Sequence, residues 1–260
     1  MQGVGADLAT ESARWLGRRV VVPALRACGA CAACRRGHAG LCARVGVAIA
    51  GDRRARVAAR LVVPLADEGA AAAPGVLAPP AEPAFLAALA GIGLDAYAAL
   101  LRAGVEPNRA AIVLGRGPLP RFVAALVQHR GAAAVRVPSP DDGAEAMVAA
   151  ALGAVESFGV PLIDARPRTD AHALALARPG GTVVLCGEAG ALDAAAIAAR
   201  GLAVVAAGRG HPDLLAELCA FVAQGALALA PLCRLVDDPA AARATSPDDE
   251  RVAILRTGGG

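Results

Sequence analysis

Four of the seven cysteines share the short segment from Cys28 to Cys42, where they follow the spacing C-x2-C-x2-C-x7-C. The four are Cys28, Cys31, Cys34 and Cys42. Four thiolates this close in sequence can surround one Zn²⁺ tetrahedrally, with Zn–S bonds of about 2.3 Å. Four protein ligands close the coordination shell, so such a zinc is structural rather than catalytic. We therefore predict one structural zinc per chain, held by a lobe that spans residues 26–44.

Two other readings of the cysteine cluster remain open. An iron–sulfur run also begins C-x2-C-x2-C, but its fourth cysteine follows after three residues and is trailed by proline. Here the gap is seven residues and Ala43 follows the last cysteine. A pair of disulfides or a redox C-x-x-C is chemically possible, although a C-x-x-C accounts for only two of the cysteines.

A second candidate site is the glycine-containing run Gly115-Arg116-Gly117-Pro118-Leu119-Pro120, which follows the apolar stretch at 110–114. A G-x-G-x-x-G turn between a strand and a helix cradles the pyrophosphate of a dinucleotide against the helix N-terminus. Two of the three glycines are present and Pro120 stands in place of the third. The cofactor-binding residues predicted from this pattern are Gly115, Arg116, Gly117 and Leu119, with NAD or NADP as the ligand.

The residues after the next strand bear on which dinucleotide would bind. An acidic residue that holds the ribose hydroxyls is expected about 20 residues beyond the glycines. The chain instead has Val137-Pro138-Ser139 there, and Asp141 and Asp142 come slightly too late. Arg136 and Ser139 favour a 2′-phosphate instead, and the alternative is a bare turn that binds nothing.

The elements that must position these residues fall into two parts, and we place the boundary near residue 85. Short β-branched runs at 19–23 and 61–64 end in proline and flank the cysteine segment, while 67–83 is a low-complexity connection. Beyond it, expected helices alternate with apolar strands, which is typical of a parallel sheet covered on both faces. The expected strands are 110–114, 133–137, 181–186 and 202–207, and the expected helices are 84–103, 121–129 and 212–224.

Composition narrows the class of protein. The 260 residues are 56% hydrophobic and 19% charged, which excludes a disordered chain, and a net charge of +3 gives no argument for nucleic acid. All 26 basic residues are arginine, so Schiff-base chemistry and a phosphate-loop lysine are excluded. No stretch is typical of a membrane span or a secretory signal, and we expect a cytoplasmic protein.

Two segments carry a resemblance to a known family. The segment at 17–42 resembles the structural-zinc lobe of the zinc-dependent medium-chain alcohol dehydrogenase superfamily, and 176–190 resembles a late strand of its cofactor domain. Within that superfamily, 211–232 is most similar to 6-hydroxycyclohex-1-ene-1-carbonyl-CoA dehydrogenases. The resemblance implies an α/β protein with a GroES-like β-barrel domain (1–85, truncated at its N-terminus), a Rossmann-type dinucleotide-binding domain (86–236) and a C-terminal segment (237–260) that returns toward the first.

The resemblance also implies a second, catalytic zinc, whose ligands are not found. The family's first cysteine and its Gly-His-Glu motif lie upstream of the strand at 19–23, and the residues before that strand contain neither Cys nor His. The position where the family has Asp or Cys corresponds to Gly91. A catalytic zinc needs three protein ligands and an open position. We therefore predict no catalytic residues in this chain.

Three hypotheses follow from these residues. The first is an NAD(P)-dependent alcohol dehydrogenase-type oxidoreductase, acting on a small alcohol or an acyl-CoA and impaired in this chain. The second is a non-catalytic, zinc-stapled Rossmann-like protein that binds a nucleotide or a partner subunit. The third is a zinc-independent reductase of the same superfamily, which the four-cysteine lobe disfavours. In each case we expect a homo-oligomer, with neither nucleic acid nor membrane as a partner.

Overall fold

The computed structural model describes residues 20–36, 38–47, 63–64, 82–141, 143–153, 158–238, 240–241 and 249–255. The described residues divide into two compact units. The first unit holds those up to Leu94, those from His211 to Ala241 and those from Ala253 onward. The second unit holds Asp95–Gly210 and Asp249–Val252. Residues 1–19, the connection at 67–81 and Asp142, on which some expectations rest, lie outside the described residues.

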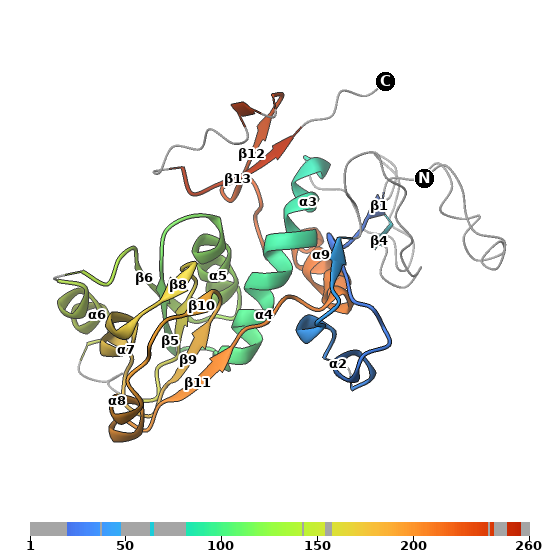
Figure 1. The fold of residues 1–260 in the computed structure, drawn as a ribbon. Coiled ribbons are helices and arrows are strands. Elements are labelled where there is room, and N and C mark those ends of the chain that lie inside the picture. Colours follow the sequence, from blue (N-terminus) through green and yellow to red (C-terminus); the bar gives the residue numbers. More distant parts are fainter. Residues whose placement is uncertain are drawn as a thin grey trace. The chain divides into compact units, whose positions relative to one another are not determined.

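A parallel sheet of five strands, in the order β11-β9-β7-β5-β6, organises the second unit (Figure 1). Its strands are β5 (Ala110–Leu114), β6 (Ala133–Val137), β7 (Leu162–Asp164), β9 (Thr182–Leu185) and β11 (Ala203–Ala206). The strand order reverses at β5, because β6 pairs with one edge of β5 and the next strand, β7, pairs with the other edge. In a sheet of this kind ligands bind at such a switch point, outside the carboxyl ends of the strands. A parallel two-residue pair, β8 (Arg168–Thr169) with β10 (Glu188–Ala189), lies beyond these ends.

The central strands form because their residues are almost all apolar and both faces of the sheet are covered. Every residue of β5 and of β7 is buried, including the carboxylate of Asp164. The expected strands match β5, β6, β9 and β11 closely, and the α/β fold with a parallel sheet is confirmed. The sequence pattern did not reveal β7, because this strand has only three residues, Leu162–Asp164, and lies between Pro161 and Pro167.

The helices of the second unit that follow β5 are α5 (Pro118–His129), α6 (Ala144–Leu152), α7 (Ala171–Leu176) and α8 (Ala194–Ala199), and most of the helix that precedes β5 also belongs to this unit. α5 contacts β5 and β6, while α6 contacts β6 and α7. Alternate residues of β5, among them Ile112 and Leu114, pack with Val148 of α6 and Leu174 of α7 in one apolar core. This core holds the carboxyl ends of the strands in place, and the loops that follow them carry the candidate site.

The end of α7 is closed by one side chain from outside the helix. Arg200 donates hydrogen bonds from Nη1 to the carbonyl oxygens of Leu174 (2.6 Å) and Ala175 (3.4 Å), and from Nη2 to that of Ala177. The last carbonyls of a helix have no partner within it, and a cation there also interacts favourably with the helix dipole. Arg200 thus supplies both the donors and the charge that this short helix lacks.

The described β-structure of the first unit consists of short strand pairs, two of which are known to be antiparallel. β1 (Val20–Val21) pairs with β4 (Val63–Pro64), and β2 (Leu25–Arg26) pairs with β3 (Gly46–Val47). A further two-stranded sheet joins β12 (Cys233–Val236) and β13 (Val252–Leu255). The remaining short elements are α2 (Ala32–Arg35), the 3₁₀ turns η3 (Ala39–Leu41), η5 (Pro83–Phe85) and η7 (Pro212–Leu214), and helix α9 (Leu215–Ala223).

The helix expected over 84–103 is present but interrupted. It consists of α3 (Leu86–Ala88), a π-helical turn η6 (Leu89–Gly93) and α4 (Leu94–Ala103). Within η6 the carbonyl oxygen of Ala90 accepts a hydrogen bond from the backbone N–H of Ala24 at 2.8 Å. Residues 86–103 are also long and apolar enough to cross a membrane, yet 61% of this stretch is buried inside the protein, as is typical of a core helix.

Candidate functional site

The four cysteines of the predicted metal lobe converge in the structure. Each offers one Sγ atom, and the four Sγ atoms lie within 4.8 Å of one another. The Cys28–Cys34 and Cys31–Cys42 pairs are separated by 3.9 Å, and the Cys31–Cys34 pair by 3.4 Å. The paired strands β2 and β3 flank the lobe. Cys34 lies within α2, and Cys42 directly follows η3. All four are free cysteines, so the structure contains no disulfide among them.

These separations suit a tetrahedral ion. A tetrahedron with metal–sulfur bonds of about 2.3 Å has sulfur–sulfur edges of about 3.8 Å. Backbone N–H groups also point at the sulfurs, from Cys31 to the Sγ of Cys28 at 3.4 Å and from Cys28 to the Sγ of Cys42 at 3.3 Å. The donor set therefore fits one zinc ion, bound by Cys28, Cys31, Cys34 and Cys42.

The pKa values of the thiols in the lobe are shifted in opposite directions. Backbone hydrogen bonds from Ala30 and Cys31 lower the pKa of Cys28 to about 6. Desolvation, followed by the hydrogen bond with Cys31, raises the pKa of Cys34 to about 11. Four sulfurs in contact cannot all ionise at neutral pH without a cation among them, because each new thiolate repels the others. A divalent cation removes this conflict by stabilising every thiolate at once.

The predicted nucleotide loop lies where the sheet topology favours a ligand. Gly115 and Gly117 have φ angles of +124° and +103°, which residues with a side chain rarely adopt. Gly117 is the N-cap of α5, and Pro118 and Pro120 lie in its first turn, where a missing N–H is tolerated. Arg116 is exposed and Leu119 is half-buried. The loop therefore directs the N-terminus of a 12-residue helix at the switch point.

An acidic side chain from near the C-terminal end of the described chain lies against this loop. Glu250 accepts a hydrogen bond from the backbone N–H of Gly117 (3.4 Å to Oε1) and an ion-paired hydrogen bond from Arg136 (2.7 Å from Nη2 to Oε2). The Glu250 side chain is 17% exposed and that of Arg136 is 35% exposed. Arg136 lies in β6, so the arginine predicted to favour a 2′-phosphate does lie beside the glycine loop.

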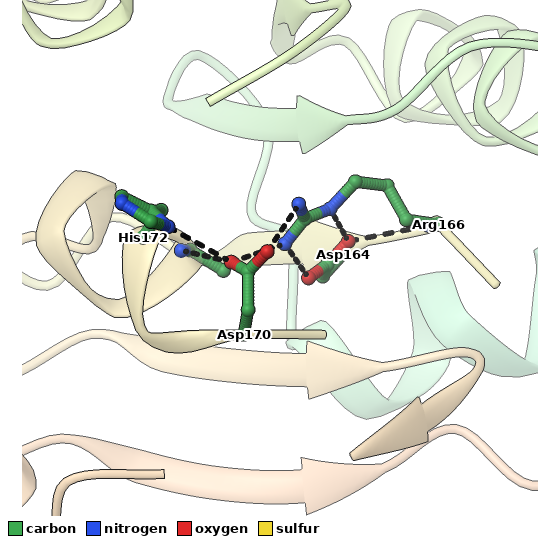
Figure 2. A network of polar contacts seen from close by, with 5 residues as sticks. Asp164, Arg166, Asp170 and His172 are labelled. Carbon is green, nitrogen blue, oxygen red and sulfur yellow. Dashed lines mark hydrogen bonds and ion pairs between the residues drawn. The ribbon is translucent and has the colours of Figure 1, made fainter. Parts of the chain in front are cut away.

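A second polar network occupies the carboxyl end of β7 (Figure 2). The guanidinium of Arg166 donates to both oxygens of the fully buried Asp164, at 2.9 Å from Nε and from Nη2. It also donates to both oxygens of Asp170, at 3.2 and 3.3 Å. His172 lies 3.8 Å from Asp170 and is largely exposed. Arg166 thus balances two carboxylates, one of which has no access to water.

This network has electrostatic consequences for each partner. Hydrogen bonding to Asp164, opposed by desolvation, raises the pKa of Arg166 above its ordinary value. The hydrogen bond from Arg166 lowers the pKa of Asp170. A buried carboxylate is tolerated when it is paired and fully hydrogen-bonded, which Arg166 achieves for Asp164.

Arg166 also fills the space that Gly115 leaves. A Cβ atom added to Gly115 would lie 3.0 Å from Cγ of Arg166 and 3.2 Å from Cγ of Pro120. A Cβ atom added to Gly117 would meet nothing within 4 Å. The two glycines therefore differ: Gly115 makes room for the chain's own arginine, while Gly117 faces open space apart from its bond to Glu250.

Sequence reasoning identified the cysteines and the loop but missed Asp164, Arg166 and Glu250. Asp164 ends a strand of only three residues and Arg166 lies just beyond it, while Glu250 lies 133 positions along the chain from Gly117. No spacing rule connects such distant residues. Among the described residues, the four cysteines are the only group of three or more Cys, His, Asp or Glu side chains with metal-binding geometry.

Comparison with known proteins gives structural neighbours only. No protein-family model matches the sequence, and no curated protein matches it. Solved structures do match: a "putative zinc-binding dehydrogenase" from Sinorhizobium meliloti 1021 bound to NADP has a TM-score of 0.67 at 19% identity, covering 92% of this chain and 77% of that chain. Alcohol dehydrogenase TADH from Thermus sp. ATN1 has a TM-score of 0.62 at 21% identity, covering 84% of this chain and 72% of that chain.

The D-arabinose dehydrogenase from Sulfolobus solfataricus is a third neighbour, with a TM-score of 0.65 at 18% identity over 85% of this chain and 73% of that chain. All three are dehydrogenases that share the architecture found here. The chain therefore shares its fold with these solved dehydrogenases, which is the fold that the resemblance implied. The narrower similarity to 6-hydroxycyclohex-1-ene-1-carbonyl-CoA dehydrogenases stays a prediction.

Proposed function

We propose that this chain is an alcohol dehydrogenase-type oxidoreductase that binds NADP in preference to NAD and is braced by one structural zinc. The observation that carries the proposal is the convergence of the Gly117 N–H and the Arg136 guanidinium on one anionic group at the end of β5. A neighbour of the same fold is bound to NADP. An anion held by a helix N-terminus and an arginine is the arrangement that a dinucleotide phosphate requires.

In this proposal the zinc has no contact with substrate. Cys28, Cys31, Cys34 and Cys42 supply all four ligands, so no position is open to an alcohol oxygen. The ion would supply folding free energy, because it links a loop with little apolar core of its own. Of the four ligands only Cys42 is buried, which fits a lobe held by ligation rather than by packing.

The dinucleotide would be held by the chain's own backbone and one side chain. Gly117 presents its N–H to a phosphate, and its missing side chain leaves the approach open. Arg136 lies beside it and provides a positive charge for the same phosphate group. No acidic residue occupies 137–139, where one would repel a 2′-phosphate and bind the ribose hydroxyls of NAD instead.

We propose that the chain binds a dinucleotide but catalyses hydride transfer only slowly. Hydride transfer from an alcohol needs a group that stabilises the developing alkoxide, and a catalytic zinc needs three ligands. Within the described residues no second metal-binding group exists, and Gly91 carries no ligand. We therefore propose slow turnover of a small alcohol or a hydroxyacyl-CoA, and the alternative is a subunit that binds dinucleotide without reacting.

The test combines binding and metal content. NADPH and NADH are titrated into the full chain by fluorescence and calorimetry, with expected dissociation constants in the micromolar range and tighter binding of NADPH. Metal analysis is expected to give about one zinc per chain. Failure to bind either dinucleotide would refute the proposal, whereas binding without alcohol-dependent reduction of NADP would select the non-catalytic alternative. Light scattering and cell fractionation test the homo-oligomer and the cytoplasmic location that we propose alongside.

A further inference from the structure

We propose that Glu250 is a built-in competitor of the nucleotide: its carboxylate holds the phosphate position at the N-terminus of α5 and must leave before a dinucleotide binds. This inference rests on the proposed function and adds a form of regulation to it. The two oxygens of one carboxylate engage the Gly117 N–H and the Arg136 guanidinium. These are the same two donors that would hold a phosphate.

The charges support competition rather than a shared site. Glu250 neutralises Arg136, so in this arrangement Arg136 offers little net attraction for a further anion. A phosphate brought next to Glu250 would meet a negative charge within contact distance, and like charges so close are unfavourable. Either the carboxylate or the phosphate can hold the donors, and each binds only when the other is absent.

Arg136 is not saturated by the carboxylate. Its Nε atom is buried and has no hydrogen-bond partner among the described residues. A buried donor without a partner carries a free-energy cost that a better-matched acceptor removes. A phosphate has more acceptor oxygens than a carboxylate and can reach a second face of the guanidinium. The nucleotide is therefore able to displace Glu250 rather than being permanently excluded.

Arg166 takes no part in this competition. This arginine overlies Gly115, but both of its carboxylate partners, Asp164 and Asp170, already bind its guanidinium. It is therefore not a free cation that could draw the phosphate away from Gly117. The donors that we expect to change partner when a nucleotide binds are the two now bound to Glu250.

The experiment compares Glu250→Gln with the matched variant Asp249→Asn in NADPH titrations of the full chain. Gln keeps the size of the side chain but loses its charge, so we expect NADPH to bind about fivefold more tightly. Asp249, one residue earlier, is bound to Arg251 at 2.9 Å, and its variant should change the affinity less than about twofold. Equal affinity of Glu250→Gln and the unmodified chain overturns the proposal, as does an equal gain in Asp249→Asn.

Two further measurements keep the proposal separate from the proposed function. If no dinucleotide binds, inorganic pyrophosphate is titrated instead; tighter binding to Glu250→Gln still supports the competitor, and no difference overturns it. In the unmodified chain, hydrogen exchange of the 249–255 amides should become faster when NADPH or pyrophosphate saturates the loop. Unchanged exchange under saturation overturns the displacement of Glu250.

Discussion

The cysteine lobe and the glycine loop are both motifs of a few residues, yet they differ in where their partners come from. The lobe is complete within Cys28–Cys42: its four sulfurs and the N–H groups that bond to them belong to one short segment. The loop at 115–117 is contacted by Arg166 and Glu250, and Arg136 is ion-paired to Glu250. These three residues lie 19 to 133 positions along the chain from the nearer glycine of the loop. A local motif can be judged from its spacing, whereas a motif completed by distant residues can be judged only from the fold.

Loss of the metal should produce the largest change in stability, because all of its ligands lie within the short segment Cys28–Cys42. Replacing Cys42 with Ser is expected to abolish zinc binding and to remove several kcal/mol of stability from the lobe, because ligation free energy is folding free energy there. Metal analysis and thermal unfolding measure this. Cys186→Ala is the control, since burial, followed by the charges of Asp164 and Asp95, raises the pKa of Cys186 to about 12 and makes its thiol a poor ligand. Zinc loss in the control would break the comparison.

Removal of Arg166 tests how far the surroundings of the loop depend on a distant pair. Arg166→Met would leave the fully buried Asp164 without its ion-pair partner, and breaking a buried pair costs about 3 kcal/mol of the free energy of unfolding. Urea denaturation measures the loss. Arg168→Met, at an exposed arginine two positions later, should change stability by less than about 0.5 kcal/mol. Equal effects of the two variants would show that Asp164 does not need Arg166.

The two glycines of the loop should respond differently to the same change. Gly115→Ala combines a φ angle of +124° with a close approach to Arg166 and is expected to cost about 2 kcal/mol of stability. Gly117→Ala meets no neighbour within 4 Å and should cost about 1 kcal/mol, which reflects its backbone angle alone. In NADPH titrations the order should reverse, because Gly117 faces the proposed phosphate. A larger affinity loss in Gly115→Ala would contradict the assignment of open space to Gly117.

The pH dependence of stability should show the smallest effect. Arg166 lowers the pKa of Asp170, so the folded state binds a proton less readily than the unfolded chain does. The resulting stabilisation is fully present above the unfolded pKa of about 3.9 and is lost as the pH falls through the lower folded pKa. Asp170 is 48% exposed, which limits the contribution to about 0.5 kcal/mol. Asp170→Asn should flatten this part of the pH–stability curve, and an unchanged curve would assign it to other carboxylates.

The sequence predicted the parts of the fold that rest on long apolar runs. The bounds of β5 and β6 were predicted to the residue, because β5 is a continuous apolar run that ends before Gly115 and β6 is a largely apolar run that ends before Pro138. β7 was missed because its three residues give no period, and with it the buried carboxylate of Asp164. The predicted domain boundary near residue 85 stays a prediction.

The candidate site divides in the same way. The cysteine cluster was predicted in full from its spacing, and the structure brings its four sulfurs together. The glycine loop was predicted from two glycines and a helix, while the residues that decide whether an anion can enter were not. Ion pairs between distant residues leave no trace in a single sequence, since any arginine can find any carboxylate.

One consequence of the Arg200 contacts concerns the basic residues of the whole chain. A single planar guanidinium reaches three backbone carbonyls at the end of α7, from two different nitrogen atoms. An ammonium group is a compact point charge whose donors diverge from one nitrogen, so it could not span the same three oxygens. Because all 26 basic residues of this protein are arginines, one side chain can bind the free carbonyls at a helix end where two lysines would otherwise be needed.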